Sequence, residues 1–392
     1  MKIAFVTPRY STDGGAETAT RLLAEALVTR RGIEVEVLTT TAIDMNWNEE
    51  FAAGSSSIEG VRVERCAVDH ARADDFALRS DRLLRAPRRA TDAIESAWLE
   101  AQGPVSRGLI AAIENCDADV ISMGPYLYHP IVEGARHARR PVVLHGAAHD
   151  EAPLSLAMYR DLYERVDGLA YWSNAERALV LDRFAVASTP QAVIGLGVDS
   201  VQADEAAARA TVGLDPDQPY ILCLGRVDDL KGTTLAARLF ASYADRHPGD
   251  LSLVFAGAVV DAPEPHPRLR VVGKVDEATK WGLLRGAVAL VSPSAFESFG
   301  IVLFEAWSLA RPVFVNARCA VTAEHVRSSH GGVAFADQAD FDAAIERLLA
   351  EPETAAMFGT AGSEYSTRMF SWDAVLDRYL RLVEQVLRHR SA

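Results

Sequence analysis

The sequence has little of several features that would assign a protein to a class at once. Four cysteines are scattered along 392 residues, with no CxxC pair and no histidine in a zinc-like spacing. Cys66, Cys116, Cys223 and Cys319 are therefore expected to be reduced thiols of a cytoplasmic protein rather than disulfides or zinc ligands. No run of about eighteen apolar residues occurs, so no transmembrane helix is expected.

Positive charge is also scarce, since 40 lysines and arginines face 54 acidic residues and give a net charge of −14. That balance argues against general nucleic-acid binding. The fingerprint G-x-G-x-x-G is missing after the first apolar segment, which disfavours a nicotinamide dehydrogenase. The N-terminal apolar segment is too short for a signal peptide and continues into Arg9, so it predicts a first buried strand.

The most informative stretch is residues 292–306, SPSAFESFGIVLFEA. It follows an apolar run at 287–291 that predicts a buried parallel strand. A loop with Glu297, Ser298 and Gly300 comes next, and then an apolar helical pattern that contains Glu305. A helix start near Phe299 would present free N–H groups and a positive dipole end to a phosphate, while carboxylates accept hydrogen bonds from sugar hydroxyls.

Two cations follow an earlier predicted strand, residues 220–224. Arg226 and Lys231 lie five residues apart, ahead of a predicted helix. A guanidinium fork and an ammonium group that converge at a strand end would bind a diphosphate and stabilise the charge of a leaving group. Asp228 and Asp229 make this loop less positive. They are adjacent and are expected to be loop residues, and the chain is expected to have no Asp-x-Asp metal motif.

The first half offers two further candidate sites. Its first strand, 3–7, runs into a loop with Gly14 and Gly15 ahead of an amphipathic helix, which predicts an anion or sugar-phosphate cradle. Another short strand, 141–144, is followed by His145, His149 and Asp150. Polar groups at the carboxyl end of a parallel strand are where open α/β sheets bind ligands, and a structural role for either histidine stays open.

Glu297 and Glu305, with seven residues between them, Ser-Phe-Gly after the first and Arg-Pro-Val at 311–313, resemble the E-x7-E signature of the family 4 glycosyltransferases. Those are retaining enzymes of the GT-B fold that use nucleotide sugars. The resemblance covers nearly the whole chain. It extends to the Gly-Gly loop, the Ala-His-Asp-Glu-x-Pro segment that ends at residue 153, and Gly-Val-Asp at 197–199.

The resemblance implies an α/β protein with two Rossmann-like parallel-sheet domains that face each other across a cleft. Residues 1–200, completed by a C-terminal helix at 371–392, would form the acceptor domain, and residues 201–370 the donor domain. Retention would need no glycosyl nucleophile, because the leaving phosphate takes the acceptor's proton on the same face. The implied catalytic residues are Glu297, His149, Arg226 and Lys231, with His145 and Asp150 as further candidates. The implied donor-binding residues are Gly14, Gly15, Gly273, Lys274, Val275, Ser298, Phe299, Gly300, Ile301 and Glu305.

The expected function is transfer of a hexose-type sugar from a UDP- or GDP-sugar to a hydroxyl of a glycan, glycolipid or small molecule, with no cofactor and no metal. Two alternatives stay open: a GT-B sugar-nucleotide epimerase or hydrolase, and a non-catalytic sugar-nucleotide-binding protein. A basic stretch at 79–89 leaves weak peripheral membrane contact open, although a solvated helix face is favoured. The acceptor, the base of the donor and the oligomeric state are not predicted.

Overall fold

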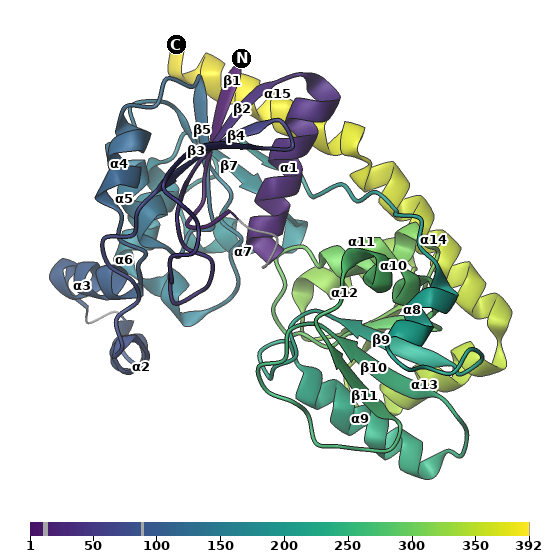
Figure 1. The fold of residues 1–392 in the computed structure, drawn as a ribbon. Helices are drawn as coiled ribbons and strands as arrows, with labels where there is room; N and C mark the ends of the chain where they lie inside the picture. The colour runs from purple at the N-terminus through teal and green to yellow at the C-terminus, as the bar shows by residue number, and fades with distance from the viewer. Residues whose placement is uncertain (11–14, 88–89, 392) are drawn as a thin grey trace. The chain divides into compact units, whose positions relative to one another are not determined.

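The computed structural model describes residues 1–10, 15–87 and 90–391 (Figure 1). The chain divides into two compact units, which are considered separately. The first unit is Met1–Leu196 with Trp372–Ala392, and the second is Gly197–Ser371. The division lies a few residues before the expected boundary at residue 200. No helix in the described part of the chain is both long enough and apolar enough to span a membrane.

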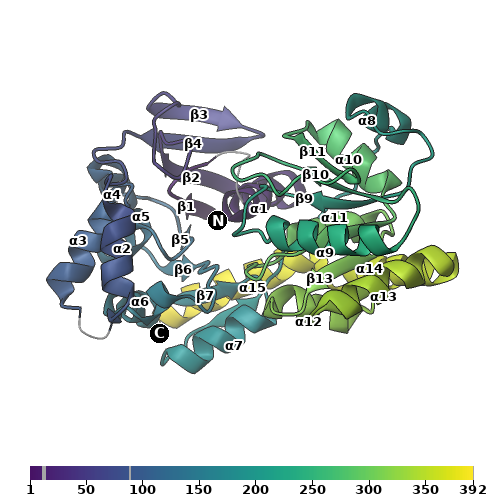
Figure 2. The same cartoon turned by 90° about the horizontal axis from the view of Figure 1, so that it is seen from below.

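The first unit is built on an eight-stranded sheet within the described residues, in the order β3-β4-β2-β1-β5-β6-β7-β8. All neighbouring strands are parallel except β3 and β4, which form an antiparallel hairpin at the edge, as Figure 2 shows. The central strands are buried on both faces, which explains their continuous apolar sequences. The strands are β1 (Lys2–Val6), β2 (Glu34–Thr40), β3 (Gly54–Ile58), β4 (Val61–Cys66), β5 (Val120–Met123), β6 (Val142–Leu144), β7 (Gly168–Tyr171) and β8 (Gln191–Val193).

Helices cover both faces of this sheet (Figure 1). Ala4 and Val6 of β1 belong to a large core cluster with α4, α5 and α6, whereas Phe5 between them contacts α15 on the opposite face. This alternation is the period-two pattern of a strand. The helices are α1 (Gly15–Arg31), α2 (Phe76–Leu84), α3 (Asp92–Gln102), α4 (Arg107–Glu114), α5 (His129–His137), α6 (Ala157–Arg165), α7 (Asn174–Arg183) and α15 (Trp372–Ser391), with a 3-10 turn, η2 (Ala152–Ser155).

The C-terminal helix α15 packs into the first unit. Its Tyr379 hydroxyl lies 2.6 Å from Ser122 Oγ on β5. Arg378 donates to the backbone carbonyl of Ile194, and Arg31 of α1 forms an ion pair with Asp373. The last helix is therefore part of the same core as the first strand.

The second unit has a fully parallel six-stranded sheet among its described residues, in the order β11-β10-β9-β12-β13-β14. Helices α9 and α13 pack on one face, and α10, α11 and α12 on the other. The strands are β9 (Tyr220–Leu224), β10 (Ser252–Ala256), β11 (Leu269–Gly273), β12 (Ala289–Ser292), β13 (Val313–Asn316) and β14 (Gly332–Phe335). The helices are α8 (Glu205–Thr211), α9 (Thr233–Arg246), α10 (Glu277–Gly286), α11 (Ile301–Ser308), α12 (Ala320–Ser329), α13 (Gln338–Ala350) and α14 (Pro352–Phe370).

Candidate functional site

Three loops of the second unit converge at the carboxyl edge of its sheet, on the backbone of Pro293. Gly232, the residue directly before α9, has a φ of 72°, and a Cβ atom there would lie 2.5 Å from the Pro293 carbonyl oxygen. From the neighbouring strand β13, Asn316 Nδ2 donates to the same oxygen at 2.9 Å. The loops after β9, β12 and β13 are therefore fixed to one another, and only glycine fits at position 232.

Glu297 and Lys231 form an ion pair between two of these loops. Lys231 Nζ donates to Glu297 Oε1 at 2.8 Å, with side-chain exposures of 38% for the lysine and 18% for the glutamate. Because the pair is only partly buried, its contribution to stability is small, about 0–1 kcal/mol. Both charged groups remain at the carboxyl edge, where a ligand of an α/β sheet binds.

Asp228 organises the loop that carries both predicted cations. Arg226 Nε donates to one oxygen of the buried Asp228 carboxylate. The other oxygen accepts from the Lys231 backbone N–H at 2.7 Å, and the Asp228 carbonyl accepts from Thr233 Oγ1 at 2.8 Å. The contact between Arg226 and Asp228 therefore agrees with the expectation that Asp228 lowers the local positive charge.

Helix α11 begins at Ile301 rather than near Phe299, because Gly300 takes a left-handed conformation with a φ of 79°. A Cβ atom on Gly300 would lie 2.9 Å from Thr322 Cγ2. The Phe299 ring is buried and stacks on Phe304 at 4.3 Å. Phe299 therefore anchors the loop in the core, and the first N–H groups of α11 lie at the end of the loop that carries Ser298.

Glu305 lies inside α11 and is paired with a lysine that sequence reasoning had left without a role. Lys280 Nζ of α10 donates to Glu305 Oε1 at 2.9 Å, and it also lies 2.8 Å from Glu277 Oε2. Burial raises the pKa of the Glu305 carboxyl, and the positive charge of Lys280 opposes that rise. The carboxylate is therefore held in a fixed position by a half-buried cation.

Gly273, Lys274 and Val275 follow β11 at the edge of the sheet. Gly273 has a φ of 76°, and its carbonyl accepts from the Gly257 N–H at 2.8 Å, which ties the ends of β10 and β11 together. A surface cavity of about 640 Å³ runs along β11, a volume within the range of ligand pockets. It is lined by residues 211–213, 269–272, 274–276 and 279.

In the first unit, the predicted Gly-Gly cradle is only partly described. Gly14 lies outside the described residues, and Gly15 is the first residue of α1. The start of this helix is joined to the segment that follows β1 by a buried ion pair, with Arg9 Nε 2.7 Å from Glu17 Oε1. Arg9 Nη1 also donates to the Ile43 carbonyl at 3.0 Å.

His145 is buried at the end of β6, on the face of the sheet that α15 covers. Its Nε2 atom lies 3.3 Å from Ser122 Oγ, and its ring centroid is 5.3 Å from that of Trp172 and 5.7 Å from that of Tyr379. Burial lowers the pKa of His145 to about 3. The imidazole is therefore neutral at physiological pH and packs as an aromatic core side chain.

His149 and Asp150 lie farther along the same loop. His149 is half-buried, and its carbonyl accepts from the Glu151 N–H at 2.8 Å. Asp150 has a side chain that is 74% exposed and pairs with Arg183 Nη2 at 2.7 Å. The Glu176 carboxylate accepts from the Ala148 N–H at 3.0 Å, directly before His149.

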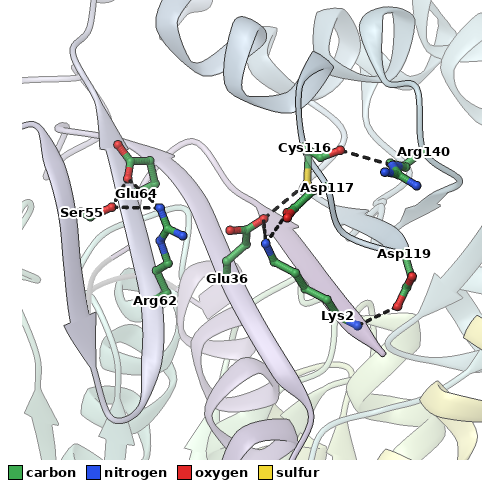
Figure 3. Close-up of polar contacts among 9 residues, drawn as sticks. All are labelled: Lys2, Glu36, Ser55, Arg62, Glu64, Cys116, Asp117, Asp119 and Arg140. Atoms are coloured by element: carbon green, nitrogen blue, oxygen red, sulfur yellow. Dashed lines mark hydrogen bonds and ion pairs between the residues drawn. The ribbon is translucent and has the colours of Figure 1, made fainter.

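The opposite, amino-terminal edge of this sheet also carries charged residues, which Figure 3 draws. Two aspartates there do have Asp-x-Asp spacing, Asp117 and Asp119, so the expectation that the chain has no such motif was wrong. Both bind Lys2: Asp117 pairs with its Nζ atom, and Asp119 Oδ2 accepts its backbone N–H at 2.8 Å. Glu36 Oε1 lies 3.2 Å from the same Nζ atom. These aspartates join β1 to the segment before β5, away from the carboxyl edge.

The structure brings Arg226, Lys231 and Glu297 together in one loop cluster, and places His149 and Asp150 in one loop of the other unit. Sequence reasoning gave no role to Lys280, Asn316 and Glu176. The first two are far in sequence from the groups they contact, so no local pattern reveals them. Glu176 had a signal, because Ser173-x-x-Glu176 is a capping-box sequence.

Comparison with known proteins identifies a family domain in the second unit. Residues 204–365 match the family described as "Glycosyl transferases group 1". A curated relative, D-inositol 3-phosphate glycosyltransferase of Segniliparus rotundus, is 32% identical over 199 residues, which are 47% of this chain and 44% of the relative. The chain thus spans about half the length of the curated relatives it matches.

Solved structures match over almost the whole chain. Sucrose-phosphate synthase of Thermosynechococcus elongatus has a TM-score of 0.73 at 19% identity and covers 99% of each chain. Anabaena HepE, solved in complex with UDP and glucose, has a TM-score of 0.69 at 15% identity, with 98% of this chain and 100% of HepE covered. This chain therefore has the GT-B fold of two parallel-sheet α/β units, and within it carries a glycosyl transferases group 1 domain.

Proposed function

We propose that this protein is a retaining family 4 glycosyltransferase that moves a hexose-type sugar from a nucleotide diphosphate sugar to an acceptor hydroxyl. The observation that carries the proposal is the loop cluster at Pro293, which fixes Arg226, Lys231 and Glu297 at one edge of the second sheet. Residues 201–370 act as the donor domain, and residues 1–200 with the C-terminal helix as the acceptor domain.

Each group in the cluster has a chemical task. The bond between the anomeric carbon and the diphosphate oxygen breaks while a bond to the acceptor oxygen forms on the same face. The acceptor's proton passes to the leaving phosphate. Arg226, Lys231 and the first N–H groups of α11 stabilise the charge that grows on the diphosphate. Glu297 accepts hydrogen bonds from hydroxyls of the sugar, and His149 binds a sugar hydroxyl through a ring nitrogen. Glu305 accepts hydrogen bonds from the ribose hydroxyls.

The relatives support this class of reaction without fixing its substrates. One matched relative is named for transfer to D-inositol 3-phosphate, and the HepE structure holds UDP and glucose. UDP- and GDP-sugars are the first donors to test. Metal independence and a cytoplasmic location stay predictions. The epimerase or hydrolase alternative and the non-catalytic alternative are not favoured, because the family that residues 204–365 match is described as one of glycosyl transferases.

The test is a nucleotide-release assay with UDP-, GDP-, ADP- and dTDP-sugars, offered with cyclitol and hexose phosphate acceptors and run both with and without a chelator. Release of one nucleoside diphosphate, with NMR showing the donor's anomeric configuration in the product, is the expected result. Release that occurs only without the chelator would contradict the predicted metal independence. A product with inverted anomeric configuration would contradict the predicted retention. No release from any donor by the folded protein would contradict the whole proposal.

A further inference from the structure

The backbone that leads to His149 is held in an unfavourable conformation. Ala147 has a φ of 55°, in the left-handed region that residues other than glycine and asparagine avoid. Gly146 beside it is fixed by packing, because a Cβ atom there would lie 2.2 Å from the Tyr163 hydroxyl and 3.4 Å from Glu176 Oε1. Such a conformation persists only where the surroundings over-determine it.

The Glu176 carboxylate supplies that restraint. The residue is 1% exposed, and its two oxygens bind N–H groups from two different strand ends. Oε1 accepts from the Ala148 N–H after β6 at 3.0 Å, and Oε2 accepts from the Trp172 N–H after β7 at 2.7 Å. One side chain thus ties the loop that carries His149 to the neighbouring strand.

The sequence around Glu176 is that of a capping box, but the glutamate is used differently. Ser173 caps α7 in the usual way, since its Oγ atom accepts from the Glu176 N–H at 3.1 Å. In an ordinary box the glutamate returns to the N–H of the capping residue. Here its carboxylate reaches Trp172 and Ala148 instead. Capping of α7 therefore does not account for Glu176.

We propose that Glu176 is a positioning residue, which as a carboxylate anion sets the conformation of residues 146–148 and thereby the place of His149. The proposal rests on the proposed transfer function, in which His149 binds the sugar. Glu176 itself touches neither substrate, and it acts only through the backbone that it holds.

The anion is needed because both bonds come from N–H donors. A protonated carboxyl carries a hydrogen on one oxygen, and an amide replaces one oxygen by a donor, so each can accept only one of the two bonds well. Burial raises the pKa of the Glu176 carboxyl to about 7, and the N–H groups of Trp172, Ala148 and Ala147 oppose that rise. The titratable neighbours of Glu176 are the buried phenols of Tyr163 and Tyr171, and the charged Arg177 of α7 acts on Tyr171.

Activity and stability should therefore respond to pH in opposite directions. The loop geometry needs the anion, so turnover should fall as the pH drops through about 7. Stability should move the other way, because a carboxyl with a raised folded-state pKa binds its proton more tightly in the native state than in the unfolded state. Between the ordinary glutamate value of 4.5 and about 7, the contribution of Glu176 to stability decreases as the pH rises, and Glu176→Gln should remove that contribution from the stability curve.

A double-mutant cycle between Glu176→Gln and His149→Ala separates positioning from general structure. In the wild-type background, Glu176→Gln should lower kcat by about 10–100-fold and leave the KM for the donor within about twofold, since the donor groups lie in the other unit. In the His149→Ala background, the same change should lower kcat by less than about threefold, because the residue that it positions has gone.

The matched control is Glu95→Gln. Glu95 is also buried, and its two oxygens accept the N–H groups of Ala157 at 3.0 Å and Met158 at 2.8 Å at the start of α6. We expect this variant to lose stability, with an equal effect on kcat with and without His149. Hydrogen exchange of residues 146–149 should rise in Glu176→Gln and not in Glu95→Gln.

The outcomes distinguish the two levels of the account. A loss of turnover in Glu176→Gln that is the same with and without His149, or unchanged exchange of residues 146–149, would overturn the positioning role while the transferase function stood. Absence of turnover in the wild-type protein with every donor would overturn the function and with it the role of Glu176.

Discussion

The carboxyl edges of the two sheets hold their polar side chains in different ways. In the second unit, charged side chains bind other charged side chains: Lys231 binds Glu297, Lys280 binds Glu305, and Arg226 binds Asp228. In the first unit, the Glu176 carboxylate is held by backbone N–H groups, and the neutral His145 is enclosed by aromatic rings and a serine.

This difference indicates what each edge can do. A partly exposed ion pair can exchange one partner for a ligand of the same charge at little cost, so a phosphate can replace the Glu297 carboxylate beside Lys231. A carboxylate whose oxygens are used by its own backbone offers nothing to a ligand, and instead fixes the geometry around it. The second edge is therefore suited to binding an anion, and the first to placing a side chain.

The largest expected effect comes from removing one cation of the second edge. Lys231→Ala leaves Glu297 without its partner and removes the positive charge that would stabilise the leaving diphosphate. The kcat for nucleotide release should therefore fall about 10²–10³-fold. Arg238, which is exposed on α9 in the same unit, provides the control, because Arg238→Ala should leave kcat within about twofold. Equal losses in both variants would mean that the loss of turnover is not specific to the loop cluster at Pro293.

The buried histidine of the first edge should matter for stability. His145→Ala leaves a cavity between β6 and α15 and should lower the free energy of unfolding by about 2–4 kcal/mol, measured by urea denaturation. His149→Ala, in a half-buried loop position, should cost less than about 1 kcal/mol. A larger loss of unfolding free energy in His149→Ala than in His145→Ala would contradict the assignment of His145 as the buried structural histidine.

The pH dependence of stability gives an independent check on His145. Its folded-state pKa is about 3 and its ordinary value is 6.5, so the unfolded state gains a proton first on acidification. The contribution of His145 to stability should therefore decrease as the pH falls from about 6.5 toward 3, so His145→Asn should lose less stability than the wild type over that range. A curve of unchanged slope in the variant would show that His145 is not buried as a neutral ring.

A smaller effect is expected where the loops of the second edge meet. Asn316→Ala removes the donor to the Pro293 carbonyl and the acceptor of the Arg318 N–H, which lies 3.0 Å from Asn316 Oδ1. Because these groups are buried, the loss of unfolding free energy should be about 1–3 kcal/mol. Binding of the nucleotide should weaken in parallel. Undiminished affinity would show that the loop after β12 keeps its form without this contact.

The smallest effect should come from Asp150, whose ion pair with Arg183 is exposed. Asp150→Asn should change the free energy of unfolding by less than about 0.5 kcal/mol and kcat by less than about twofold. Arg183→Gln serves as the paired variant and should behave alike. A large loss of turnover confined to Asp150→Asn would give this carboxylate a part in the chemistry.

Much of the fold could be predicted because buried parallel strands leave a strong local pattern. The apolar run at 220–224 coincides with β9, and the expected strand at 141–144 differs from β6 by one residue. The hairpin strand β3 was not predicted, since its sequence Gly-Ser-Ser-Ser-Ile is polar and exposed and has no alternation. No prediction covered β14, a four-residue strand whose pattern is too short to distinguish from a loop.

The site could be predicted only as far as local sequence describes it. The loop before α11 combines a strand end, glycine and glutamate within a few residues, so its position was clear, although the left-handed Gly300 moves the helix start to Ile301. Lys280 reaches Glu305 across 25 residues, and Glu176 reaches Ala148 across 28. Such contacts depend on the sheet order, which sets the neighbours of each strand end and which no local pattern contains.

The central claim is that the loop cluster at Pro293 binds the nucleotide of a sugar donor. The most direct measurement is calorimetric titration of UDP, GDP, ADP and dTDP into the full chain with a chelator, for the wild-type protein, Arg226→Ala and Arg238→Ala. We predict saturable binding of one nucleotide, at least about tenfold weaker in Arg226→Ala and unchanged in Arg238→Ala. Binding of none of the four by the folded wild-type protein, or equal affinities in all three proteins, would contradict the account.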